Sequence, residues 1–376
     1  MNAVVKKRVV MALADVLAVF SLIIAFWCVF YKLRSFFNNA LDKISVLAVE
    51  STFFRGNSFN ILKCSPCNLI SNNFSHDENL FKNDRFEVKP SNMQLPDFIK
   101  NSNQKPCQDD NQTKYKIIEN HFSGGIKCEN FYVKNSTGLE INFADELKKP
   151  ASVKFNNSND PQVLIFHTHT SESYMENDQD FFYESFYPRS LENSKNVTAV
   201  GQAVCDKLCE NGIKAIHDTT YHDNPTYNGS YARSAKTVKS LLEKYPSIQM
   251  VIDIHRDSMG NNSTGKMKPV FKYKDKKAAQ LMIISGCDSD NKLGFPNWNQ
   301  NLRLALKVQK YAESMFPGIT RPLNFAKVRY NEHLTPGSLL IEIGSDVNTL
   351  EEAVYTGSML GESLSAMIKD IKKNGG

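Results

Sequence analysis

The alternation of short apolar runs with helix-like segments after Pro150 is the feature that most constrains the fold of this chain. The runs carry few charges and are rich in β-branched residues, which is the pattern of strands buried on both faces. They are QVLIFHTH (162–169), KAIHD (214–218), IQMVIDIH (248–255), QLMIISG (280–286) and SLLIEIG (338–344). Strands that alternate with helices predict an α/β domain with a mostly parallel central sheet flanked by helices.

The segments between the runs have the apolar period of helices. In the first of them, Val200, Val204 and Leu208 share one helix face, and Gly212 is placed to end the helix. The sequence predicts helices over 196–211, 230–245, 299–315 and 349–373. The predicted α/β domain therefore spans residues 155–373, which is enough for a core of its own.

Residues 1–34 predict a membrane anchor. The segment from Val9 to Tyr31 is an almost unbroken apolar run of about the length that crosses a bilayer as a helix. Basic residues at positions 6–8 precede it, which places the N-terminus in the cytoplasm and the rest of the chain outside the cell membrane. A cleavable signal peptide is the alternative, but the run is longer than a usual signal core.

Residues 35–154 differ from both neighbouring regions, because from about residue 55 they are rich in Asn, Ser, Lys and Asp and contain only short apolar pieces. This composition predicts an extracytoplasmic linker, partly disordered and with possible short strands. The net charge of the chain is only +5, and its charged residues are interspersed. The sequence therefore argues against a nucleic-acid-binding protein.

Three of the predicted strands end in residues that can carry chemistry. The first leads into His167, His169 and Glu172, the second into His255 and Arg256, and the third contains Glu342. Ligand sites in α/β sheets lie beyond the carboxyl ends of the strands, so we expect these side chains to meet at one edge.

Two histidines and a carboxylate form a recurring ligand set of catalytic zinc. Glu342 would then be free to take a proton from a metal-bound water, while Asp253 or Asp257 could orient a ligand histidine. A structural alternative exists for each group: a histidine after a strand is often a hydrogen-bonded loop residue, and Glu342 could form a buried ion pair with Arg256. The sequence contains no G-x-S-x-G, H-E-x-x-H or P-loop motif that would favour other chemistry.

Several motifs in this order resemble those of the stage II sporulation protein P family of endospore-forming bacteria. They are FHTHTSESY (166–174), NVTAVGQAV (196–204), VIDIHRDS (251–258) and YNEHLTPGSLLIEIGSDVNTLEEA (330–353). The resemblance implies a zinc-dependent N-acetylmuramoyl-L-alanine amidase with an amidase-like (phosphorylase/hydrolase-like) fold. Such an enzyme would remove stem peptides from the glycan strands of peptidoglycan during forespore engulfment, and it could also cleave peptide cross-links. The implied partners are stage II sporulation proteins D and M.

The resemblance also assigns roles to single residues. His255 matches a metal-ligand histidine and Glu342 the catalytic glutamate. His169 matches the first ligand histidine of the wider amidase class, and His167 falls on a neighbouring position. Glu172 has a fixed place in the motif and is the preferred carboxylate ligand, but three other residues compete with it: Glu176, Glu184 and Glu192. The chain departs from the family at 331–333, which read Asn-Glu-His where Asn-Gln and an acidic residue are expected.

The residues and the resemblance lead to the same hypothesis of amide hydrolysis at a zinc site. Glu342 would pass a proton to the leaving alanine nitrogen, and Arg256 would bind a stem-peptide carboxylate or the developing oxyanion. The alternative from another class is a non-catalytic peptidoglycan-binding scaffold of the engulfment complex.

Overall fold

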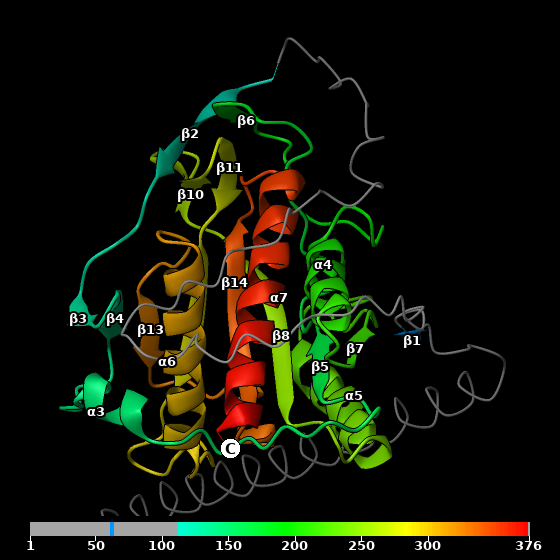
Figure 1. Ribbon diagram of the computed structural model, residues 1–376. Helices are drawn as coiled ribbons and strands as arrows, with labels where there is room; N and C mark the ends of the chain where they lie inside the picture. Colours follow the sequence, from blue (N-terminus) through cyan, green and yellow to red (C-terminus); the bar gives the residue numbers. More distant parts are fainter. Residues whose placement is uncertain (1–60, 64–111, 375–376) are drawn as a thin grey trace, which may run out of the picture. The chain divides into compact units, whose positions relative to one another are not determined.

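The computed structural model describes residues 61–63 and 112–374, all within one compact unit, Asn60–Gly376 (Figure 1). The expected membrane anchor and most of the expected linker lie outside these residues. In the part of the chain that is described, none of the helices combines the length and the apolar character needed to span a bilayer.

The main sheet has nine strands, and it is mixed. Their order is β1 (Ile61–Lys63), β7 (Ala215–Asp218), β5 (Val163–Phe166), β8 (Met250–Asp257), β14 (Ser338–Ser345), β12 (Leu281–Gly286), β13 (Leu323–Ala326), β4 (Phe131–Asn135) and β3 (Ile126–Cys128). Strands β7, β5, β8 and β14 run parallel, but β12 runs antiparallel to β14, β1 to β7 and β3 to β4.

The prediction of a mostly parallel sheet is therefore wrong, although the α/β class is correct. The reason lies between β8 and β12, where the chain passes through β9 (Gly260–Asn261), β10 (Gly265–Tyr273) and β11 (Lys276–Ala279). A parallel neighbour needs a long crossover, usually a helix. Since strands replace the helix here, β12 returns antiparallel in the middle of the sheet.

Helices cover the two faces of the sheet. Helices α4 (Val197–Glu210), α7 (Leu350–Lys373) and α6 (Trp298–Met315) lie side by side over one face (Figure 1). Helix α5 (Ser230–Lys244) packs on the other face. Side chains alternate along a strand, so Val163 and Ile165 of β5 join the large core under α4, whereas Leu164 and Phe166 join the smaller core under α5.

Part of the segment expected to be linker is folded into this unit. Strand β4 pairs with β13, and β2 (Lys114–Asn120) pairs with β10 in a second sheet that also contains β6 (Phe181–Tyr183). The short helix α3 (Phe143–Lys148) follows β4, and its Phe143 and Leu147 belong to the large core. The expected boundary at residue 155 therefore falls inside the folded unit.

Candidate active site

The chemistry-bearing strands are neighbours in the sheet. Strands β5, β8 and β14 are adjacent and parallel, so their carboxyl ends meet at one edge, as the sequence predicts. His255 of β8 and Glu342 of β14 are direct register partners. Since Ile254 and Ile341 belong to the large core, His255 and Glu342 face the other side of the sheet, where α5 packs.

The structure brings together His169, Glu172 and His255. The imidazole centroids of His169 and His255 are 5.3 Å apart, with the rings nearly perpendicular. The Glu172 Oε2 atom lies 3.6 Å from His255 Nδ1, and all three residues are buried. A turn after β5 holds the segment in place, because the Glu172 backbone N–H donates to the carbonyl of His169.

His167 lies on the other side of the sheet from this cluster. Its Nδ1 atom is 2.8 Å from the carbonyl oxygen of Ile254, and its Nε2 atom is 2.8 Å from Nε2 of His217. Both ring nitrogens are thus engaged inside the protein, next to Gly201 of α4. Of the two candidate first ligands, His169 is the one beside His255.

Two carboxylates hold the ring of His255. Its Nε2 atom lies 2.9 Å from Asp253 Oδ1, on the side opposite Glu172. Asp253 is itself fixed by Thr168, whose backbone N–H and hydroxyl both donate to it. Burial disfavours the imidazolium, but the charges of Asp253 and Glu172 outweigh it and raise the pKa of His255 well above its usual value.

The pKa values of Glu172 and Glu342 are shifted in opposite directions. Burial disfavours the Glu172 carboxylate, but the neighbouring His255 imidazole and the charge of Arg256 outweigh this and lower its pKa to about 2. For Glu342, burial dominates and raises the pKa to about 8, and its Oε2 atom is buried without a hydrogen-bond partner. Two carboxyl groups with separated pKa values are typical of an acid–base site.

The other candidate carboxylates lie on the surface. Glu176, Glu184 and Glu192 are exposed, and Glu176 and Glu192 form ion pairs with Lys195. Glu172 is therefore the one of the four candidates that lies in the cluster.

The guanidinium of Arg256 contacts the backbone. Its Nε atom donates to the carbonyl of Ser173 and its Nη2 atom to that of Pro188, at 2.9 and 2.7 Å. The backbone N–H of Arg256 donates to Glu172. No ion pair joins Arg256 to Glu342 among the residues that the structure describes. The side chain thus ties the segment after Glu172 to β8.

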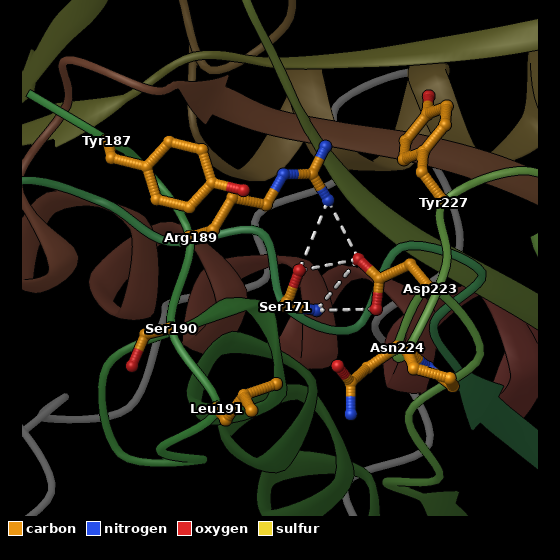
Figure 2. A pocket seen from close by; sticks show the side chains of 9 residues that line it. Ser171, Tyr187, Arg189, Ser190, Leu191, Asp223, Asn224 and Tyr227 are labelled. Atoms are coloured by element: carbon orange, nitrogen blue, oxygen red, sulfur yellow. Dashed lines mark hydrogen bonds and ion pairs between the residues drawn. The ribbon is translucent and has the colours of Figure 1, made fainter.

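Aromatic and basic side chains that the sequence did not predict surround the site. The ring of Tyr227 stacks on His169 with centroids 4.3 Å apart, and Tyr231 of α5 packs against His169 and His255. Arg189 forms an ion pair with Asp223 at 2.7 Å (Figure 2). Arg189 also lies 3.9 Å from Glu172. The signal for the tyrosines was present, since YHDNPTYNGSY (221–231) follows a strand that ends at the same edge.

The donor set fits zinc by its chemistry. Two imidazoles and a carboxylate are zinc ligands, and His169 Nδ1 is buried without a hydrogen-bond partner. As the side chains stand, however, the ligand atoms do not all lie within 4.8 Å of one another, whereas those of Glu119, Asp178 and Glu352 do. This second group already surrounds a cation, because the Nζ atom of Lys268 lies within 3.5 Å of all three carboxylates.

Comparison with known proteins tests the family resemblance. A family model described as stage II sporulation protein P matches residues 68–365. The stage II sporulation protein P of Bacillus subtilis (strain 168) is 29% identical over 260 residues, which cover 62% of this chain and 60% of that protein. The chain thus aligns with about 60% of the length of this curated relative.

Solved structures of amidases are also similar. The N-acetylmuramoyl-L-alanine amidase AmiC2 of Nostoc punctiforme is 14% identical, with 57% of this chain and 97% of that chain covered and a TM-score of 0.33. The CwlD amidase from Clostridioides difficile, in complex with the GerS lipoprotein, is 13% identical, with 57% and 99% covered and a TM-score of 0.35. Both TM-scores are low. The family model, by contrast, covers most of the chain and confirms the resemblance, so the chain belongs to the stage II sporulation protein P family.

Proposed function

We propose that this protein is a zinc-dependent N-acetylmuramoyl-L-alanine amidase that removes stem peptides from peptidoglycan during forespore engulfment. The observation that carries the proposal is the meeting of His169, Glu172, His255 and Glu342 at the ends of three adjacent parallel strands. Family membership supports the peptidoglycan substrate and the role in sporulation. We further propose that an N-terminal anchor holds the catalytic domain outside the cell membrane, near stage II sporulation proteins D and M.

His169, Glu172 and His255 would hold the metal. When bound, zinc supplies Lewis-acid chemistry, which polarises the amide carbonyl and makes water a stronger nucleophile. Asp253 lies 2.9 Å from Nε2 of His255 and would orient the ring once the metal is bound, and the hydrogen bonds from Thr168 keep Asp253 in place. His167 has both nitrogens engaged elsewhere and supports the segment that carries His169.

Glu342 is the proposed general base and acid. A carboxylate that takes a proton from water and returns it to the leaving nitrogen works best with a pKa near the operating pH. Burial raises the pKa of Glu342 to about 8, and its unpartnered Oε2 atom is available for a proton. The protonated carboxyl is then the donor to the alanine nitrogen as the amide bond breaks.

Arg256 receives a positioning role. To bind a substrate carboxylate or the oxyanion, its guanidinium would have to leave the carbonyls of Ser173 and Pro188. Those bonds fix the chain on both sides of the loop that begins at Glu172. We therefore assign to Arg256 the orientation of Glu172 and not direct contact with the substrate.

Substitution of Glu342 and His255 tests the division of roles. Glu342→Gln keeps the size of the side chain but cannot accept a proton, so we expect bound zinc to be retained and turnover to fall at least about a hundredfold. His255→Ala removes a ligand, so zinc and turnover should both be lost. Zinc is measured by elemental analysis of the purified full chain and turnover on purified peptidoglycan. Equal zinc loss in the two variants would overturn the assignment.

Product analysis separates the amidase from its rivals. An amidase releases stem peptides with a free N-terminal alanine, and a chelator should abolish this release. Cleavage within cross-links, with the lactyl amide intact, would indicate a peptidase instead. Binding to peptidoglycan with no fragment released, with or without zinc, would favour the non-catalytic scaffold.

A further inference from the structure

A pocket of about 530 Å³ adjoins the proposed metal site (Figure 2). Its walls come from two segments that are far apart in the sequence, the irregular stretch at 187–191 and the loop at 223–227 after β7. Ser171, next to Glu172, completes the wall on the side of the metal ligands. A ligand in this pocket would therefore lie beside the reacting bond.

Tyr227 links the pocket to the site. One face of its ring stacks on the imidazole of His169, with an interplanar angle of 10°. The guanidinium carbon of Arg189 lies 5.2 Å from the centroid of the same ring. Tyr227 is still 55% exposed, so the edge of the ring remains open to a ligand.

Most of the exposed large apolar side chains among the described residues gather at this pocket. Of the five large apolar side chains that are exposed in the described part of the chain, three line it: Tyr187 at 77%, Leu191 at 60% and Tyr227 at 55%. The two tyrosines stand on opposite sides of Arg189 (Figure 2). A cluster of exposed apolar groups with polar neighbours marks a binding surface.

The charge of the pocket lining favours the glycan over the stem peptide as its ligand. Its only charged lining residues are Arg189 and Asp223, and they neutralise each other at 2.7 Å, with a further hydrogen bond from Arg189 to Ser171. A stem peptide carries carboxylates and would need an unpaired cation, which this lining does not offer. The glycan offers neutral N-acetylated sugars, whose C–H faces stack on tyrosine rings and whose hydroxyl and acetamido groups can bond to Asn224 and Ser190.

We propose that this pocket binds an N-acetylated sugar of the glycan strand, with the exposed ring of Tyr187 as the stacking platform and the edge of Tyr227 beside it. This inference rests on the proposed amidase function and adds a glycan subsite to it. The sugar would anchor the strand next to His169 and leave the stem peptide to lie on the other side of the metal ligands.

The test is binding of a neutral, peptide-free glycan, chitotetraose, measured by calorimetry on the purified full chain. Tyr187 makes no polar contact with the metal ligands, so Tyr187→Ala should weaken binding by about threefold to tenfold, the range expected for one lost stacking contact. Tyr187→Phe keeps the ring and should bind like the original chain. Tyr132→Ala, at the far end of the main sheet in β4, is the matched control and should change nothing.

The outcomes separate this inference from the proposed function. Normal binding of chitotetraose by Tyr187→Ala would show that the glycan subsite is wrong. The same conclusion would follow if a free stem peptide displaced the sugar and Tyr187→Ala weakened the binding of that peptide. Either result would count against the subsite even if the original chain releases amidase products. If Tyr187→Ala weakens sugar binding but the original chain releases no stem peptide from peptidoglycan, the subsite stands and the amidase proposal fails.

Discussion

At the scale of single residues, a buried pair of histidines supports the segment that carries His169. The Nε2 atoms of His167 and His217 are 2.8 Å apart. Burial lowers the pKa of His167 to about 4 and that of His217 well below its usual value. Gly201 of α4 leaves room for the pair, because a Cβ atom there would lie 2.7 Å from both Nε2 atoms.

Gly201→Ala should therefore destabilise the protein, although alanine is the better helix former by about 1 kcal/mol. Both rings are fixed by hydrogen bonds, His167 to Ile254 and His217 to Gln202, so they cannot move away from the methyl group without loss. We expect a net loss of about 1–2 kcal/mol in the free energy of unfolding, measured with denaturant. Glu210→Ala, at the exposed end of α4, is the control, and equal stability of the two variants would contradict the steric argument.

At the scale of elements, a buried lysine joins the second sheet to the start of α7. Lys268 of β10 is fully buried, and its Nζ atom lies 2.9 Å from Glu352 and 2.5 Å from Asp178. Glu352 also closes a capping box with Thr349 at the first turn of α7. Lys277 of β11 contacts Asp178 as well, but 30% of its side chain is exposed.

The two lysines predict unequal effects of the same substitution. Lys268→Met leaves Glu352 buried without its cation, so we expect a loss of about 3–5 kcal/mol. Lys277→Met removes a more exposed cation, for which about 1 kcal/mol or less is expected. Thermal or denaturant unfolding of both variants measures the difference. Similar losses in the two variants would show that the burial of Lys268 does not determine how much its ion pairs contribute to the free energy of unfolding.

The sequence predicts those elements whose pattern is local. Helices α4, α5, α6 and α7 and strands β5, β8 and β14 have a clear apolar period or run, and the structure contains all of them. The second sheet is different, because β10 (GKMKPVFKY) alternates lysine with apolar residues and reads as a surface segment. Lys268 of β10 is buried, and the carboxylates that pair with it lie far away along the chain, at Glu119, Asp178 and Glu352.

The same limit applies to the site. The strand ends identify His255 and Glu342, because a parallel sheet brings its carboxyl ends together. The choice of Glu172 over Glu176 or Glu192 depends on the path of an irregular loop, which no period encodes. Likewise, only the folded chain shows that Arg256 bonds the carbonyls of that loop.

At the scale of the whole molecule, stability should depend on pH through Glu332. This residue lies in the short helix η1 (Glu332–Leu334), between α6 and β12, and is 2% exposed. Its Oε2 atom accepts a hydrogen bond from the backbone N–H of Gly286 at 2.6 Å, while Oε1 has no partner. Burial raises its pKa well above the usual value. The family resemblance leads us to expect glutamine at this position.

The sign of the effect follows from proton uptake. Above the unfolded pKa of about 4.5, the folded chain holds a proton on Glu332 that the unfolded chain has lost, so stability falls as pH rises toward the folded pKa. Glu332→Gln removes this titration and can still accept the bond from Gly286. The difference in unfolding free energy between Glu332→Gln and the original chain should therefore grow in favour of the variant from pH 5 to 8, up to about 1.4 kcal/mol per pH unit. Glu351→Gln, at an exposed site on α7, should show no such trend. A constant difference across this range would mean that Glu332 is already ionised in the fold, and its burial would then have to be compensated by a partner other than Gly286.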